Sequence, residues 1–304
     1  MTYRFDVMSP SPDAPRTHLR RALVGLRRGR PPDPSDSPSD PDPAVLDLVA
    51  DPFESVDDAH GRLSALERLF YERDDRRGPF LAIYSRVTRE VGREIEADSF
   101  ADPAWVESYL VAFADLYRQA LFRFETGDIE ALADPWQVAF ESARAGDNLV
   151  AQDAVLGINA HVNYDLALAL ATVGVSPSRE DKYADHCAVN AVLRRLVDEV
   201  QDRLADRYAP GLSDVDESLG RLDEALSFLA LAEGRDAAWW AAVALSDSRF
   251  GVRRTAARWF LRVSSTGTAY LLLGPTVSRR LRDTLREVER GHDSTHDPGH
   301  ADGD

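Results

Sequence analysis

The chain has 304 residues, 44% of them hydrophobic, so it is long enough to bury a sizeable core in one large domain or two smaller ones. Its 52 Asp and Glu residues outnumber 36 Lys and Arg residues and give a formal net charge of -16 at pH 7. This balance argues against nucleic acid and against an anionic membrane as partners. The single cysteine, Cys187, excludes an intrachain disulfide and a cysteine-based zinc site.

Arginine replaces lysine almost completely in this sequence. Lys182 is the only lysine, and the other 35 basic residues are arginines. Codon usage rich in G and C explains the arginines, and abundant aspartate suits a cytosol of molar salt, where ions screen self-repulsion. The composition predicts an acidic, halophilic proteome in an archaeon or a GC-rich bacterium. Codon bias in an ordinary actinobacterium is the alternative.

The apolar runs of the sequence are too short to suggest secretion or membrane insertion. Residues 1–8 contain Arg4 and Asp6 and are not followed by the apolar segment of a secretory signal. The longest candidate run, near residues 269–273, is far shorter than the ~20 apolar residues of a spanning helix. We expect a soluble, cytoplasmic protein.

The two ends of the chain are predicted to be disordered tails. Residues 1–50 are largely tail, because the stretch RPPDPSDSPSDPDPA at 30–44 has no apolar periodicity to offset the entropy of ordering. The basic segment 18–30 can form a short amphipathic helix, which is either a solvated face or a contact site for an acidic surface. Residues 291–304 carry three histidines, but a proline and a glycine prevent a helix there, so we expect a solvated tail.

Between the tails, residues 51–290 show one helical pattern after another. Ser55, Pro79 and the pair Asp102-Pro103 are typical helix starts, and Gly146 and Gly174 are typical ends. No stretch alternates strictly between polar and apolar residues, so the sequence predicts an all-α fold, a single bundle of about eight to ten helices. The later helices are expected at 128–145, 148–173, 178–208, 214–231, 236–245, 249–263 and 276–288.

The predicted helix at 148–173 carries a polar cluster within the apolar run LGINAHVNYDLALAL. Asn159 and Asn163 share one face of the helix, whereas His161 and Asp165 share another. At least one stripe must point inward if the leucines between them are buried. Buried polar groups without partners cost roughly 1–3 kcal/mol each, so the cluster needs mutual hydrogen bonds or a ligand. A hydrogen-bonded His161–Asp165 pair that holds the helix in register is the structural alternative.

The next predicted helix carries a similar pair, His186 followed four residues later by Asn190. The short loop at 174–177 predicts that the two helices are antiparallel neighbours, with both histidines ~12–14 Å from the hairpin end. Histidines and carboxylates at one height are typical of a divalent metal site for zinc, iron or manganese. The metal candidates are His161, Asp165, Asp185 and His186; the catalytic candidates are His161, Asp165 and His186; and the candidates for substrate binding are Asn159, Asn163, Tyr164 and Asn190.

These residues support three hypotheses of different classes. The first is a metal-dependent hydrolase or oxygenase, or without a metal an enzyme in which His161 and Asp165 do acid and base chemistry. The second is a non-catalytic protein that binds a small apolar or amphipathic ligand between tryptophans, and the third is a structural protein with a buried polar network. The tryptophans that could form core or pocket walls are Trp136, Trp239, Trp240 and Trp259.

The octapeptide NAHVNYDL at 159–166, with DHCAVNAVL at 185–193, resembles an uncharacterised all-helical family of actinobacteria and halophilic archaea. Members of that family share a core of the form N-A-H-[IV]-N-x-D-L. The stretches RRGPFLAIYSRVT at 76–88 and AWWAAVAL at 238–245 are similar as well. The resemblance covers residues 51–290 and implies a shared helical domain, without implying any chemistry.

Overall fold

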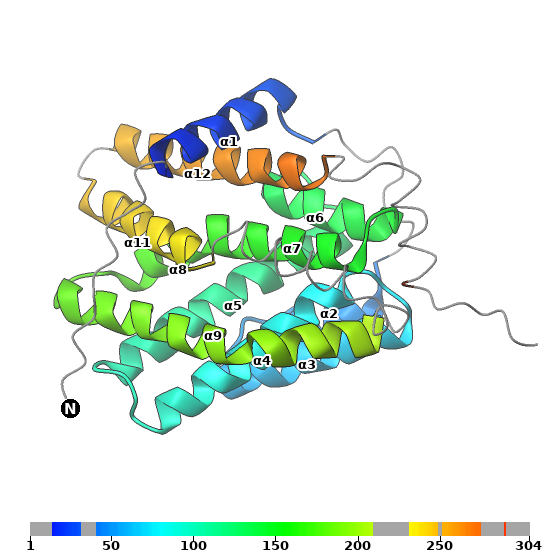
Figure 1. The fold of residues 1–304 in the computed structure, drawn as a ribbon, viewed down its shortest axis with the longest axis horizontal. Coiled ribbons are helices and arrows are strands. Elements are labelled where there is room, and N and C mark those ends of the chain that lie inside the picture. The colour runs from blue at the N-terminus through cyan, green and yellow to red at the C-terminus, as the bar shows by residue number, and fades with distance from the viewer. Residues whose placement is uncertain (1–13, 32–40, 209–230, 249–250, 275–288, 290–304) are drawn as a thin grey trace, which may run out of the picture.

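The computed structural model describes residues 14–31, 41–208, 231–248, 251–274 and 289 (Figure 1). Within these ranges the regular elements are helices and no strand is present, which confirms the predicted all-α class. The predicted helix at 276–288, residues 214–230 of another and the expected tail at 291–304 lie outside the described residues.

A helical hairpin forms one side of the bundle. It consists of α3 (Val56–Glu72) and α4 (Gly78–Glu96), and α5 (Pro103–Glu125) packs across both. The predicted starts are confirmed, because Ser55 Oγ accepts from the amide of Asp58 at 3.1 Å and Asp102 accepts from the amide of Trp105 at 3.0 Å.

The centre of the bundle is one long helix that follows α6 (Asp134–Ala145). It consists of α7 (Val150–Ala160), a π-helical turn η1 (His161–Asp165) and α8 (Leu166–Val173). Of the described helices, only Val150–Val173 is long and apolar enough to cross a membrane. Because 72% of its most apolar window is buried inside the fold, it has the character of a core helix.

The remaining helices surround this centre. α9 (Arg179–Tyr208) lies mainly along α4, α11 (Leu231–Asp247) packs on α8, and α12 (Gly251–Leu272) covers α6 and α7. α1 (Ala14–Arg28) lies along α12, so that these two helices form an outer layer at the top of Figure 1.

The helices α8 and α9 do not form the predicted antiparallel pair. α8 packs between α5 and α11, whereas α9 turns away to lie along α4. The turn between them is fixed to α5 at the carbonyl of Gly174, which accepts from Trp105 Nε1 at 2.9 Å and from Lys182 Nζ at 3.4 Å. These contacts between distant parts of the chain set the direction in which α9 leaves.

The helical body also begins before residue 51, where the sequence predicted largely disordered chain. The short helix α2 (Pro43–Val49) buries Val45 and Val49 against α3 and α5, and α1 lies along α12. Apolar residues in short runs are enough here because the rest of the bundle supplies the surface that covers them. The other expected tail residues, 1–13 and 32–40, lie outside the described part.

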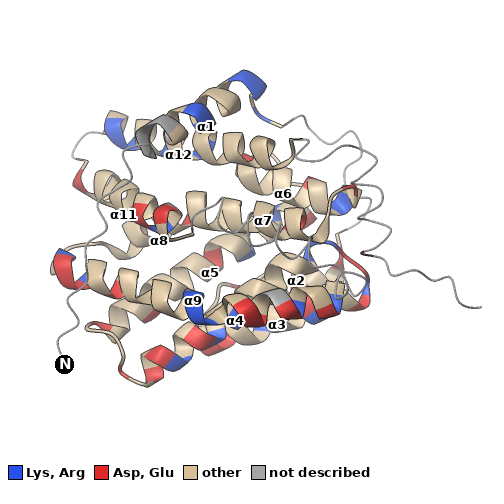
Figure 2. Ribbon diagram, in the orientation of Figure 1, with Lys and Arg blue, Asp and Glu red and all other residues tan. Residues whose placement is uncertain are grey.

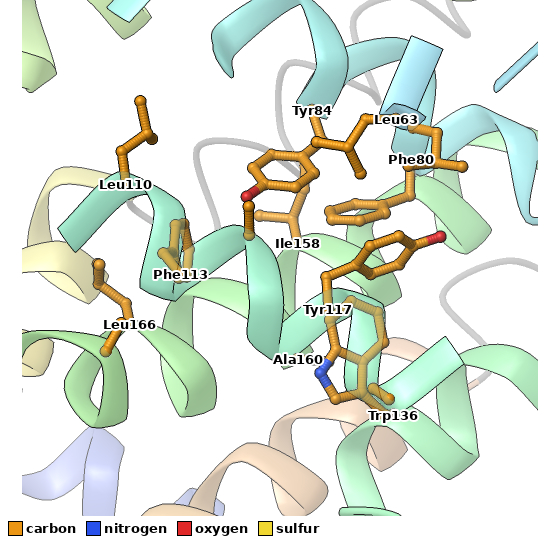
Figure 3. Packing of buried hydrophobic residues seen from close by; sticks show 14 of the residues in the cluster. Leu63, Phe80, Tyr84, Leu110, Phe113, Tyr117, Trp136, Ile158, Ala160 and Leu166 are labelled. Carbon is orange, nitrogen blue, oxygen red and sulfur yellow. The ribbon is translucent and has the colours of Figure 1, made fainter. Parts of the chain in front are cut away.

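Aromatic side chains fill the core where α4, α5 and α6 meet the central helix. The rings of Phe80, Tyr117 and Trp136 follow one another at centroid distances of 5.3 Å, next to Tyr84 and Phe113 (Figure 3). Large rings bury more apolar area than any other side chains, so this cluster holds the four helices together. It also forms the surroundings of the polar residues in η1.

Candidate functional site

The π-helical turn η1 lies in the middle of the polar cluster predicted from the sequence. The amide of Leu166 donates to the carbonyl of His161, five residues back, where an α-helix would bond four residues back. Such turns are rare and often occur at functional sites. The wider turn places His161 and Asp165 on one side of the helix and Asn159 and Asn163 on the other.

His161 and Asp165 form the predicted hydrogen-bonded pair, and a tryptophan of α6 completes it. The Nδ1 atom of His161 lies 3.1 Å from Oδ2 of Asp165, and Trp136 Nε1 donates to the same oxygen at 2.8 Å. Both members of the pair are buried. Asp165 thereby holds the imidazole in a fixed orientation, as carboxylates do for histidines in catalytic and metal sites.

The imidazole of His161 is enclosed by aromatic rings. Phe113 stacks on it with centroids 3.5 Å apart, and Tyr84 approaches at 4.4 Å in an edge-to-face arrangement. Its second nitrogen, Nε2, is buried and has no hydrogen-bond partner among the described residues. A buried polar atom in this condition costs about 1–3 kcal/mol, which marks Nε2 as a candidate for binding or chemistry. The rest of the enclosure comes from Phe80, Tyr117 and Trp136.

Burial disfavours charge on both members of this pair. It lowers the pKa of His161 well below its usual value and raises the pKa of Asp165 well above its usual value. The hydrogen bond from Trp136 acts in the opposite direction on the pKa of Asp165, because it stabilises the carboxylate. Both shifts act in favour of the neutral forms, the uncharged imidazole and the protonated carboxyl group.

The two asparagines point toward α12 and bond to its backbone and to each other. Asn163 Nδ2 donates to Asn159 Oδ1 at 3.0 Å, and Asn159 Nδ2 donates to the carbonyl of Ser265 at 3.0 Å. In return, Ser265 Oγ donates to the carbonyl of Asn163 at 2.8 Å. This carbonyl lies in the π turn, so Ser265 stabilises the unusual backbone.

Tyr164, another predicted substrate contact, is half-buried at the same turn and packs against the hydrophobic core. Burial is the main cause of the raised pKa of its hydroxyl, and the charge of Asp165 contributes. The charges of Arg262 and Arg258 act in the opposite direction. Tyr164 is therefore a neutral phenol between the core and the arginines of α12.

His186 does not join His161. Its Nε2 donates to the carbonyl of Arg235 at 3.0 Å, and Nη2 of Arg235 lies 3.3 Å from its Nδ1. Arg235 Nε also donates to Asn190 Oδ1 at 2.7 Å. Both nitrogens of His186 are thus occupied, and the predicted pair of His186 and Asn190 fastens α9 to α11.

Asp185 has a structural role as well, so the predicted metal set is not assembled. Its two carboxylate oxygens accept from the amides of Ala101 and Asp102 at 2.8 Å each, just before α5. Among the described residues, no group of three or more His, Cys, Asp or Glu side chains could hold a metal. The reason is the divergence of α8 and α9, which leaves the two histidines in separate surroundings, His161 stacked on Phe113 and His186 between Tyr109 and Trp239.

An apolar cavity lies on the other side of η1, between α1, α11 and α12. Its volume is ≈ 380 Å³, and Asn163 and Arg21 are among the few polar residues that line it. Trp240 and Phe260 are exposed and form part of its wall. The remaining lining residues are small or apolar: Gly234, Ala237, Ala238, Ala241, Ala244, Ala257, Leu261, Ser264, Ser265 and Thr268.

Residues 56–275 match the model of a family described as a family of unknown function, DUF5995, and the match covers more than half of the chain. The chain belongs to this family. No curated protein and no solved structure matches it at a significant level. The DUF5995 region contains α3 to α12, and with them the π turn and most of the cavity wall, whereas α1 and α2 precede it. The resemblance to an uncharacterised all-helical family is thus confirmed.

Sequence reasoning overlooked two hydrogen bonds of the site in this DUF5995 protein. One joins the indole of Trp136, which was predicted only as a core or pocket wall, to Asp165 across 29 positions of sequence, and the other joins Ser265 of α12 to the π turn. Neither has a sequence signal, because both act through tertiary contacts. Of the predicted wall tryptophans, Trp136 and Trp239 are buried, Trp259 is exposed, and Trp240 lines the cavity.

Proposed function

We propose that this protein binds a small anionic amphiphile, with its apolar chain in the cavity between α11 and α12. The observation that carries the proposal is the cavity itself, which combines ≈ 380 Å³ of volume with apolar walls and few polar residues. Ligand sites typically have volumes of ~300–1,000 Å³ and this kind of lining. The small side chains of α11, such as Ala237 and Ala241, leave the room that a chain of methylene groups needs.

The charge of Arg21, which lines the cavity, favours an anionic headgroup. Arg21 is half-buried there, and burial lowers the pKa of its guanidinium, with Glu233 acting in the opposite direction. A carboxylate near Arg21 would offset the cost of burying this cation. Asn163, also in the lining, can bond to a polar headgroup through its side-chain amide.

Calorimetric titration with dodecanoate and dodecanol tests this proposal. Dodecanoate is expected to bind more tightly than dodecanol, and Arg21→Gln is expected to remove that preference. Ala241→Trp fills the cavity and should abolish binding, whereas Ala232→Trp, at an exposed position of α11 outside the lining, should leave it unchanged. The proposal is wrong if neither compound binds the wild-type chain and no amphiphile co-purifies with it.

A second candidate function, a metal-dependent hydrolase or oxygenase, is supported by one observation at His161. Its Nε2 is buried without a partner while Asp165 fixes the ring from the other side, which is the arrangement of a histidine prepared to bind a metal or take a proton. Binding of an amphiphile is the stronger proposal because exposed residues border the cavity, so that a ligand can enter it from solvent. His161, in contrast, is enclosed by five aromatic rings.

Metal analysis of the purified protein and of His161→Gln tests the second candidate. A stoichiometric metal that is lost in the variant would support it, and equal, substoichiometric metal in both would remove the metal-dependent form. For either candidate we place the protein in the cytoplasm, since a single unpaired Cys187 is compatible with a reducing compartment.

A further inference from the structure

The outer layer of α1 and α12 carries a charge opposite to that of the whole chain. Neither helix contains Asp or Glu, although the chain has a net charge of -16. Figure 2 shows basic segments without acidic ones on these two helices, while acidic and basic segments are mixed on α3, α4 and α9. The arginines whose side chains the structure describes in this layer are Arg20, Arg21, Arg27, Arg28, Arg253, Arg254, Arg258 and Arg262.

The same layer carries most of the large hydrophobic side chains that are exposed in the described part of the chain. Among these side chains, only Tyr71 lies outside α1, α11 and α12. The exposed fractions reach 59% for Leu19, 56% for Trp240 and 81% for Val252. The others are Leu23, Leu26, Trp259 and Phe260. Exposed apolar residues gathered on one face are typical of an interaction surface.

The apolar stripe of α1 is held outward by close packing on its inner side. A Cβ atom on Gly25 would overlap with the carbonyl of Val263, and one on Gly267 with the carbonyl of Arg21, so the backbones of α1 and α12 are in direct contact. Leu19, Leu23 and Leu26 follow the spacing of one helix face and remain exposed. The fold therefore fixes an amphipathic helix with its apolar stripe toward the outside.

We propose that the face formed by α1, α12 and Trp240 docks on the surface of an anionic phospholipid bilayer. In this arrangement the exposed leucines, Val252 and the tryptophans enter the boundary between headgroups and acyl chains, and the arginines contact lipid phosphates. The helices α3, α4 and α9 lie on other parts of the molecule and carry acids beside their basic residues, so they have no excess of positive charge to attract the bilayer. The net charge of the chain argues against an anionic membrane, but it averages over the local distribution of charge, on which binding of this face would depend.

Exposed leucine, valine and tryptophan side chains favour a bilayer over a nucleic acid, whose phosphates are contacted mainly by polar and cationic groups. Within the described part of the chain, the acids recorded beside this face are Asp134, 3.6 Å from Arg262, Glu233 near Arg21 and Glu141 near Tyr270. They are fewer than the arginines of α1 and α12. The proposal is independent of the proposed ligand, although the cavity wall that contains Trp240 and Phe260 belongs to the same face.

Co-sedimentation of the full chain with vesicles tests the proposal. We expect binding to vesicles of phosphatidylcholine with 30% phosphatidylglycerol, and little binding to phosphatidylcholine alone, in roughly 0.1 M salt. Arg20→Gln with Arg27→Gln should weaken binding on the order of 10- to 30-fold, and Leu19→Gln with Leu26→Gln should weaken it similarly. Arg68→Gln with Arg194→Gln, at exposed positions of α3 and α9, is the matched control and should change nothing.

Three results would overturn the proposal: no binding to the anionic vesicles, equal binding to neutral ones, or equal losses in the test and control pairs. Binding of a short DNA duplex with the same dependence on Arg20 and Arg27 would assign the face to nucleic acid instead. Circular dichroism of each variant excludes unfolding as the cause of a loss. Calorimetry with dodecanoate on the Arg20, Arg27 pair separates the proposals, because membrane binding should fall while ligand binding remains.

Discussion

The Nδ1 atom of His161 lies 3.1 Å from a carboxylate oxygen of Asp165, whereas the other nitrogen of the same ring has no partner. Nδ1 of the imidazole therefore has a hydrogen-bond partner, and Nε2 has none among the described residues. Satisfying both nitrogens would be easy for a purely structural histidine, as His186 shows with its two contacts to Arg235. This contrast distinguishes the two histidines, which look alike in the sequence.

Asp165→Ala should destabilise the fold strongly. The substitution leaves Trp136 Nε1 and His161 Nδ1 without a partner in an apolar environment, and each buried unpaired group costs about 1–3 kcal/mol. We expect the free energy of unfolding in urea to fall by about 2–4 kcal/mol. Asp47→Ala, at an exposed position of α2, should change it by less than about 0.5 kcal/mol. Equal effects of the two substitutions would contradict the buried network.

Because His186 is buried, the free energy of unfolding should fall in mild acid. Burial and the charge of Arg235 lower its pKa in the folded state, so below the unfolded pKa of about 6.5 the unfolded chain binds a proton that the folded chain does not. Stability is then lost as the pH falls, by up to about 1.4 kcal/mol per pH unit. For the pair of His161 and Asp165 the two pKa shifts act on the pH dependence of stability in opposite directions.

Urea unfolding between pH 5 and pH 7 measures this slope. His186→Gln should reduce the slope, by up to about 1.4 kcal/mol per pH unit near pH 5 and by less toward pH 7, because glutamine does not titrate. His60 serves as a comparison, since it is only half-buried, and His60→Gln should reduce the slope less. A variant at His186 with the slope of the wild type would show that this histidine is protonated in the fold.

Gly267→Ala should force α1 away from α12. Even one methyl group at this position would overlap with the carbonyl of Arg21, which is backbone and cannot rotate away. Inserting atoms into a tightly packed contact costs typically ~1–3 kcal/mol. Gly61→Ala, in an open position of α3, should instead be neutral or stabilising by up to about 1 kcal/mol. Thermal unfolding of both variants checks the difference, and equal melting temperatures would contradict the close contact.

Ser265→Ala should weaken the π turn. Its hydroxyl donates to the carbonyl of Asn163, and without it this carbonyl loses its partner from α12, at a cost of about 1–2 kcal/mol. Ser264 is a matched control, because its hydroxyl donates to Leu261 within the same helix. Ser264→Ala should cost less than about 0.5 kcal/mol. The rate of hydrogen exchange of the amides at 161–166 should rise in Ser265→Ala and stay the same in Ser264→Ala.

Local signals in the sequence predicted most individual helices of this bundle. Ser55 and Asp102 cap α3 and α5 as expected, and Gly146, with φ 63°, ends α6. These features depend on neighbours within about four residues, which the sequence displays directly. The pairing of helices depends on contacts between distant segments, such as Trp105 to Gly174, and these were not predictable.

The candidate site was predicted in part for the same reason. The bond between His161 and Asp165 follows from their spacing of four residues, and their burial follows from the apolar run around them. The metal site depended on an antiparallel arrangement of two helices that the fold does not adopt. The cavity depends on Arg21, Asn163 and Trp240, which come from three separate regions of the chain.

The π turn gives the central helix one residue more than an unbroken α-helix with the same two ends would hold. Removing one residue from 161–165 would restore ordinary α-helical bonding and leave α8 in phase with α7, whereas the same loss from a regular α-helix rotates everything after it by about 100°. Leu166 and Leu170, which are fully buried, would therefore keep their places, and Gly174 would still contact Trp105. Among relatives, the loss of a single residue from the central helix should therefore fall within 161–165 and spare α7 and α8.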